Sequence, residues 1–262
     1  MRTINLAFIL IISILFLTNC KKENNCVDEN KAFLVSKVFD YQNRMLADYI
    51  YNPNNQLVKR AFTDPTTGFS SDLVFNYIDN KVNEIQYIDH DFPQFNHSTF
   101  ILYDSNNKIT RSEVFQNGNI VSHTNYAYYS TGHLKHIFND NSPPIKRFEY
   151  DNNGNVNKVT HYSYDPVTGG SLQQIRFFCY DNHKKPSFNL DDITQIELIP
   201  KMGSVGSLER NISCNNMTAY DGGGTKLSYE YSEYRLPISI LTEWEGVVVE
   251  EPMLLKLEYI EK

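Results

Sequence analysis

The chain has 262 residues, of which 31 are acidic and 24 are lysine or arginine, for a net charge of −7. Such a chain lacks the basic face that nucleic-acid phosphates require, so we expect no nucleic-acid partner. Its four cysteines form no Cys-x-x-Cys pair, which excludes a zinc ribbon and a thioredoxin-type site. The length allows one large β domain or two smaller ones.

An apolar segment opens the chain. Arg2 gives it a basic start, and the residues from Leu6 to Leu17 are apolar except for Ser13. A helix of this length rises about 18 Å, which is short of the ~30 Å hydrocarbon core of a membrane. Residues 1–19 are therefore predicted to be a signal peptide.

The signal segment ends at Leu17-Thr18-Asn19-Cys20. This tetrapeptide resembles the lipobox of bacterial lipoproteins, which implies that Cys20 is lipidated and becomes the first residue of the mature protein. Several acyl chains would anchor the protein stably, since each buried methylene contributes roughly 0.8 kcal/mol. The predicted partner is therefore a membrane, reached through the lipid on Cys20. The alternative is an ordinary signal peptide that is cleaved nearby, with Cys20 incidental.

A polar stretch follows the lipidated cysteine. Residues 20–31 have no apolar periodicity and are predicted to be a flexible tether. The charged run Lys21-Lys22-Glu23 resembles the export signals of lipoproteins of Bacteroidota, which implies an anchor in the outer membrane that faces the periplasm or the cell surface. The remainder of the chain, 32–262, is predicted to be a single β-repeat domain.

Tyrosines that end an apolar strand and open a turn rich in Asn, Asp and Gly recur at a spacing of about 26 residues. A second turn follows each of them after about half a repeat, so each unit is predicted to be a two-stranded hairpin. Tyr180 and Tyr231 are about two repeats apart, which predicts one remodelled repeat between them. The repeat tyrosines are Tyr51, Tyr77, Tyr103, Tyr129, Tyr150, Tyr180, Tyr231 and Tyr259.

Apolar and polar residues alternate within the predicted strands, which is typical of an antiparallel sheet with one wet face. Seven or eight hairpins predict an all-β fold, a long antiparallel up-and-down meander of about 16 strands. A sheet of this size curls or closes, so we expect a curved shell or a wide barrel, with a two-sheet sandwich as the alternative. Any helix is expected within about 185–212. The predicted turns lie near 52–56, 64–68, 104–108, 116–119, 151–155 and 165–169.

Several stretches carry a family resemblance. Tyr150–Val156 and the Asp-Pro-Val-Thr-Gly at 165–169 resemble the YD repeats of the rearrangement-hotspot family. The stretches 180–188 and 213–218 resemble the Asn-Pro-Phe segment and the Ser-x-Asn-Asn-x-Thr box of YD-like lipoproteins from Bacteroidota. The resemblance implies an exported, surface-associated β-meander and implies no activity. The self-cleavage motif and the toxin domain of toxin shells are not visible, so toxin delivery is not predicted.

Residues that could carry chemistry are scattered over the repeats. His133 and His136 could share a ligand, but a spacing of three on a strand points them to opposite faces. The sequence has no His-Glu-x-x-His, no Gly-x-Ser-x-Gly and no phosphate-binding glycine loop. The run 151–155 could hold Ca²⁺, although a hairpin turn needs the same residues. We therefore expect no metal site, no cofactor and no catalytic centre.

Cys179 and Cys214 are predicted to form a disulfide. Cys20 carries the lipid and Cys26 lies in the tether, which leaves these two cysteines in the body. An exported protein meets an oxidising compartment, which permits the bond. The alternative is that both are buried or free thiols.

These observations predict an envelope-anchored, non-catalytic binding or scaffold protein with an unknown glycan or protein ligand. The contact surface is predicted at Trp244 and the tyrosines around 229–234, where aromatic side chains could crowd the last hairpins. The alternative is an envelope glycan or lipid hydrolase, which would require carboxylates that converge on one concave patch. The candidates for that patch are Glu84, Glu113, Asp140 and Glu149.

Overall fold

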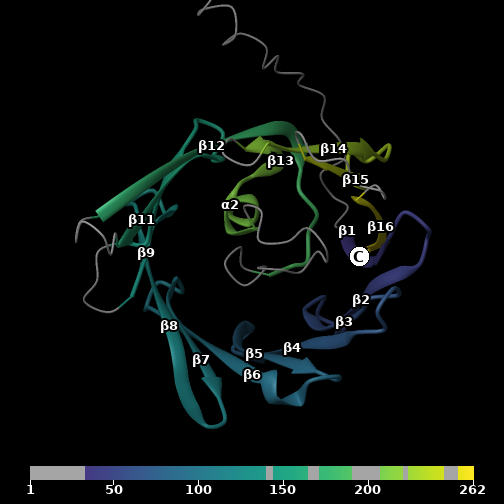
Figure 1. Ribbon diagram of the computed structural model, residues 1–262, viewed down its shortest axis with the longest axis horizontal. Coiled ribbons are helices and arrows are strands. Elements are labelled where there is room, and N and C mark those ends of the chain that lie inside the picture. The colour runs from purple at the N-terminus through teal and green to yellow at the C-terminus, as the bar shows by residue number, and fades with distance from the viewer. Residues whose placement is uncertain (1–32, 140–143, 165–170, 191–206, 221–223, 245–252) are drawn as a thin grey trace, which may run out of the picture. The chain divides into compact units, whose positions relative to one another are not determined.

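In the computed structural model, the described residues form sixteen antiparallel strands that follow one another in chain order around a closed barrel (Figure 1). The first strand, β1, pairs with the last, β16, and closes the ring. The predicted all-β meander is confirmed in its barrel form, and the two-sheet sandwich is wrong. The structure describes residues 33–139, 144–164, 171–190, 207–220, 224–244 and 253–262. The predicted signal peptide 1–19, Cys20 and the tether 20–31 lie outside them.

Most strands are seven to nine residues long, as expected for arms of a 26-residue hairpin. They are β1 (Phe33–Phe39), β2 (Met45–Tyr51), β3 (Leu57–Thr63), β4 (Ser70–Ile78), β5 (Lys81–Asp89), β6 (His97–Tyr103), β7 (Ile109–Gln116), β8 (Asn119–Tyr128), β9 (Leu134–Phe138), β10 (Lys146–Tyr150), β11 (Val156–Tyr164), β12 (Ser171–Lys184), β13 (Asn215–Tyr220), β14 (Thr225–Tyr231), β15 (Pro237–Trp244) and β16 (Met253–Glu261).

Helical structure in the described ranges is confined to two short elements. The helix α2 (Ser207–Ile212) lies within the region 185–212 where a helix was expected. The 3₁₀ turn η1 (Pro93–Phe95) lies outside it and begins at a proline, whose fixed φ suits a first helical position. None of the described helices has the length and the hydropathy of a membrane-spanning helix.

Several turns between paired strands share one construction. In the turn after β6, the Asp104 side-chain oxygen accepts the backbone N–H groups two and four residues further along, at 2.8 and 2.9 Å. Asn107 lies within this turn and has a φ of 66°, in a region of the backbone map that Asn tolerates better than most residues. The predicted turns near 52–56, 64–68, 104–108, 116–119 and 151–155 are confirmed. The turn at 165–169 lies outside the described residues.

Tyrosines join the two strands in seven of the eight described hairpins. Their hydroxyl groups donate hydrogen bonds of 2.7–2.9 Å to backbone carbonyls of the preceding strand. Burial raises the pKa of Tyr51, Tyr229 and Tyr259 above the ordinary value, so these hydroxyls remain donors at neutral pH. The pairs are Tyr51 with Val35, Tyr77 with Leu57, Tyr103 with Val82, Tyr128 with Ile109, Tyr150 with Leu134, Tyr229 with Met217, and Tyr259 with Pro237.

Two repeat positions differ from the prediction. Tyr128 takes the place expected for Tyr129, because Tyr129 is already the first residue of the turn, where its N–H donates to the His133 carbonyl at 2.9 Å. Tyr229 takes the place expected for Tyr231, whose hydroxyl donates to the Asp181 carboxylate instead. The spacing thus identified the hairpins and missed the bonding residue by one or two positions.

The strand alternation separates an apolar interior from an outer wall that carries charged, polar and some exposed apolar side chains. On β1 and β2, the inward pair Val38–Ala47 is buried, and the neighbouring pair Lys37–Asp48 faces outward. Ion pairs lie on this outer wall, where Lys59 meets Asp72 at 2.8 Å, Arg111 meets Glu113 at 2.7 Å and Lys158 meets Glu149 at 3.0 Å. Rows of inward apolar side chains from all sides of the barrel form the core.

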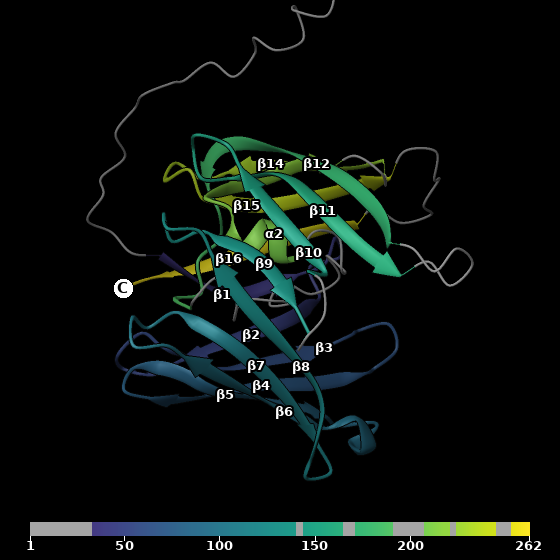
Figure 2. The same cartoon turned by 90° about the vertical axis from the view of Figure 1, so that its left-hand side faces the viewer.

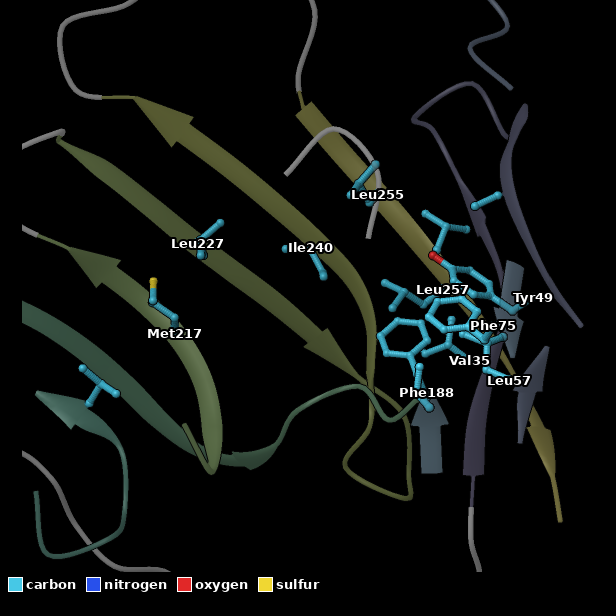
Figure 3. Close-up of a cluster of buried hydrophobic side chains, with 14 of the residues drawn as sticks. Val35, Tyr49, Leu57, Phe75, Phe188, Met217, Leu227, Ile240, Leu255 and Leu257 are labelled. Carbon is cyan, nitrogen blue, oxygen red and sulfur yellow. The ribbon is translucent and has the colours of Figure 1, made fainter. Parts of the chain in front are cut away.

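The long interval between Tyr180 and Tyr231 holds the β13–β14 hairpin and an excursion between β12 and β13, in the stretch where a remodelled repeat was predicted. β12 pairs directly with β13, and Lys184 lies opposite Asn215 at the two ends of the excursion. Near its start, Phe188 is only 3% exposed and its ring lies 5.1 Å from that of Tyr49 on β2. Figure 3 shows Phe188 among side chains of the first strands. α2 lies within the ring of strands in Figures 1 and 2.

Candidate functional site

A groove on the outer wall is the candidate binding site. It lies where β5, β6 and β7 run side by side, and its volume is about 360 Å³. The strand register places Gln86 opposite Ser98 and Ser98 opposite Phe115, in one outward-facing row. A volume of this order is typical of sites for small ligands. Asn96, Phe100 and Asn117 also contribute to the lining.

Aromatic rings give the groove an apolar surface of fixed shape. The rings of Phe100 and Phe115 meet edge to face, with centroids 5.1 Å apart. Tyr87 and His97 also border the groove, but the register places their stacked rings, with centroids 5.0 Å apart, on the inward face of the wall. Aromatic pairs contribute about 0.5–1.5 kcal/mol beyond burial, so the rings are positioned before any ligand arrives.

The loop between β5 and β6 forms one margin of the groove, and its side chains hold it in shape. The buried Asp89 carboxylate accepts two following backbone N–H groups, at 2.7 and 3.0 Å. The Asp89 N–H donates to the Asn96 side-chain oxygen at 2.7 Å. The Gln116 side chain donates to the Gln94 carbonyl at 2.7 Å, which ties this loop to the long β7–β8 hairpin visible in Figure 2.

The same loop and hairpin expose apolar side chains. Phe92 and Phe95 are 50% and 55% exposed, and their ring centroids lie 6.3 Å apart. Ile120 and Val121, at the start of β8, are exposed to a similar extent. Exposed apolar side chains that gather in one region are typical of contact surfaces. This part of the wall therefore combines a groove with exposed aromatic residues.

Glu84 lies on β5 in the row next to the groove. Its carboxylate accepts the side-chain amides of Asn76 at 2.9 Å and of Gln86 at 3.1 Å. Partial burial raises the pKa of Glu84, but hydrogen bonds from Ser98, Gln86 and Asn76 outweigh that effect and hold the pKa below its ordinary value. Glu84 is therefore an ionised acceptor that orients Gln86 and Ser98 of the groove.

The predicted carboxylates do not converge. Glu84 and Glu113 flank Phe100 in one row, two strands apart, and Glu113 binds Arg111. Glu149 binds Lys158 on β11, in another part of the wall. Asp140 lies outside the described residues. The row contains no paired carboxylates that share a proton, which is the arrangement a hydrolase would use.

The two histidines and the turn that were considered as metal ligands make other contacts in the structure. His133 stacks on Tyr150 with centroids 4.6 Å apart. Burial, together with the charges of Lys135 and Arg147, lowers the pKa of His136. Asp151 in the proposed calcium turn accepts backbone N–H groups at 2.8 and 2.9 Å, as in the other turns. Among the described residues, no three His, Cys, Asp or Glu side chains are grouped as metal ligands.

The predicted aromatic contact surface is wrong. Trp244 lies opposite Thr225, at one end of the β14–β15 pair, whereas Tyr231 lies opposite Pro237 at the other end. Tyr234 is exposed, and its ring packs on Phe33 of β1 at 4.9 Å. The aromatic residues of 229–244 are therefore spread along the hairpin and form no common surface.

The predicted disulfide is wrong as well. Cys179 and Cys214 are both free thiols, and both are exposed. The register places Cys179 opposite Ala219, which is five residues of chain, or about 16 Å when extended, from Cys214. Bridged cysteines have Cα atoms within about 7 Å, so the register keeps this pair apart.

A second polar cluster lies where the two ends of the excursion meet. The Tyr231 hydroxyl donates to the Asp181 carboxylate, and its ring stacks on His183 with centroids 4.0 Å apart. Asn216, at the end of the excursion, donates its backbone N–H to Asp181 at 3.2 Å. Burial and the Asp181 carboxylate raise the pKa of Tyr231. The cluster joins the two ends of the excursion and has a structural role.

Sequence reasoning missed the groove for a physical reason. Gln86, Ser98 and Phe115 are separated along the chain, and only the pairing of β5 with β6 and of β6 with β7 aligns them. The one local signal was the Asp89–Asn96 loop, which interrupts the regular hairpin turns with a proline and two phenylalanines.

Comparison with known proteins gave structural likenesses only. No family model matches the chain, and no curated protein matches it. A porin-like protein from Bacteroides uniformis is 13% identical, with a TM-score of 0.49, over 88% of this chain and 95% of that one. A porin-like protein from Bacteroides vulgatus is 12% identical, with a TM-score of 0.38, over 86% and 98%. At these identities and TM-scores, the likenesses establish neither a shared family nor a function.

Proposed function

We propose that the protein is an exported lipoprotein, anchored to the outer membrane through lipid on Cys20, and that its barrel stands in water and binds a ligand without turning it over. The ligand is a glycan or a protein that the anchored barrel meets in the envelope or at the cell surface. The signal segment and the lipobox-like tetrapeptide support the anchor. The groove and the exposed aromatic residues beside it support binding.

The polarity of the wall is the observation that carries this proposal. Strands of seven to nine residues are about 23–30 Å long, so the ~25 Å apolar belt of a membrane barrel would cover almost their whole length. Here the outer wall carries ion pairs such as Lys59–Asp72 and Lys158–Glu149. A lysine or arginine that faces lipid costs about 2–4 kcal/mol at the bilayer midplane. Charges distributed in this way favour water outside the barrel and a lipid anchor on the tether.

The state of the carboxylates favours binding over hydrolysis. A glycoside hydrolase needs a general acid whose pKa is raised, so that it holds a proton near neutral pH. The pKa of Glu84 is shifted the other way by its hydrogen bonds, and Glu113 is bound to Arg111. The carboxylates nearest the groove are thus suited to orient polar side chains.

Detergent phase separation of the full chain from a lipidating host tests the proposal. Wild-type protein should incorporate labelled palmitate and enter the detergent phase. The Cys20→Ala protein should carry no label and move to the aqueous phase, and Cys26→Ala should behave as wild type. A labelled Cys20→Ala protein would refute the lipidation site. An unlabelled one that remains in the detergent phase would show that the barrel itself lies in lipid.

A further inference from the structure

The groove lining is uncharged, although charged residues are common elsewhere on the wall. Its side chains are amides, hydroxyls, aromatic rings, one histidine and one isoleucine, with no Lys, Arg, Asp or Glu. From this lining we infer that the groove binds a neutral glycan. The inference deepens the proposed binding function and rests on it.

The aromatic surface suits one face of a sugar ring. Phe100 and Phe115 present apolar carbon toward the outside of the barrel, where Ser98 lies opposite Phe115 in the register. A pyranose carries C–H groups on its ring faces and hydroxyl groups around its edge, so it can pack on an aromatic ring while its edge remains free for hydrogen bonds. An aliphatic ligand would use the rings and leave the polar lining without partners, which is unfavourable.

The polar lining supplies both donors and acceptors. Because the Gln86 side-chain nitrogen donates to Glu84 at 3.1 Å, its carbonyl oxygen is left as an acceptor. Because the Asn96 oxygen accepts the Asp89 N–H, its amide nitrogen is left as a donor. A hydroxyl group donates and accepts, so a polyhydroxylated ligand matches this mixture.

Charge distinguishes a neutral glycan from an anionic one. Phosphate, sulfate and carboxylate groups are held in proteins mainly by Arg and Lys, and the lining has neither. Glu84 and Glu113 lie one on each side of Phe100 in the adjacent row. Arg111 neutralises Glu113, so the repulsion of an acidic ligand comes from the ionised Glu84, and a neutral ligand is unaffected.

Titration calorimetry on the full lipidated chain in detergent tests the inference. The probes are neutral oligosaccharides of glucose, mannose and xylose, with an oligogalacturonate as the acidic counterpart. A neutral oligosaccharide should bind better than the acidic one. Phe115→Ala should weaken that binding about two- to tenfold, because the ligand loses a ring contact. Phe177→Ala is the matched control, because it removes an outward phenylalanine on β12 that is 53% exposed. It should leave oligosaccharide binding unchanged.

Gln86→Ala tests whether the ligand binds in the groove without removing an aromatic ring. It removes one acceptor and keeps both phenylalanines, so it should weaken binding several-fold with an unchanged thermal unfolding curve. The inference is overturned by an absence of binding to the neutral probes, by preference for oligogalacturonate, or by equal losses in Phe115→Ala and Phe177→Ala. It is also overturned if only a peptide binds at the groove, which would indicate a protein partner. The palmitate and phase-separation results on Cys20 are independent of all these outcomes.

Discussion

Asp181 makes, across a long excursion of the chain, the same kind of contacts that an aspartate makes in a short turn. In the ordinary turn after β6, Asp104 accepts the N–H groups two and four residues ahead. Asp181 likewise accepts the N–H two residues ahead, that of His183, at 2.9 Å. A second N–H comes from Asn216 across the excursion, at 3.2 Å. The turn chemistry is thus retained where the chain between the two contacts has been greatly lengthened.

Acid unfolding of an Asp40→Asn variant tests this turn chemistry. Burial raises the pKa of Asp40, but hydrogen bonds from Arg44 and Gln42 and the Arg44 charge outweigh it and hold the pKa below the ordinary 3.8. A depressed folded-state pKa adds stability above pH ~4, which is lost as the pH falls through the folded value. Asp40→Asn keeps a turn oxygen and loses the charge. Its free energy of unfolding in urea should be lower at about pH 7 and fall less between about pH 4 and 2 than that of wild type.

The hairpin unit is explained by the tyrosine that bonds its two strands. The hydroxyl of Tyr77 reaches the Leu57 carbonyl on the preceding strand, and Tyr150 reaches Leu134 in the same way. A buried carbonyl needs a partner, and a tyrosine at this position supplies one while its ring fills the core. The regular spacing of tyrosines in the sequence therefore reflects one repeated bond.

Removal of single hydroxyls measures that bond. Tyr77→Phe should lower the free energy of unfolding by about 1 kcal/mol, because the Leu57 carbonyl loses its donor. Tyr150→Phe should have a similar effect, and the two losses should add, since they lie in separate hairpins. Tyr162→Phe, on the outward face of β11, is the control, with a change below about 0.5 kcal/mol. Denaturant unfolding in which all three variants behave alike would contradict the assigned role.

The sequence predicted those features that depend on neighbouring residues. Period-two alternation and turns such as 104–108 are local, so strands, turns and the all-β class followed from them. The predictions that failed concern contacts that depend on the register between paired strands. Pairing Cys179 with Cys214 ignored the register that places Cys179 opposite Ala219. The groove was missed because Ser98 and Phe115 meet only through the pairing of β6 with β7.

At the scale of the whole barrel, the main property is which side faces water. The interior is lined by apolar rows and by the repeat tyrosines, and Phe188 from the excursion packs among them. The outer wall carries ion pairs on β3–β4, on β7 and on β10–β11, so charge is spread around the circumference. An apolar interior and a charged exterior are the reverse of a water-filled membrane channel. We therefore expect water, not lipid, on the outside of the wall.

Cys179 offers a direct probe of that wall, because it is an exposed free thiol on β12 whose neighbours in the register, Ala219 and then Lys226, lie on the outward face. In a variant with Cys26→Ser and Cys214→Ser, a nitroxide on Cys179 can be examined by electron paramagnetic resonance after lipid anchoring to vesicles. We predict that a water-soluble nickel chelate relaxes the nitroxide more strongly than oxygen, which concentrates in lipid. Stronger relaxation by oxygen would place the wall in the bilayer and contradict the account.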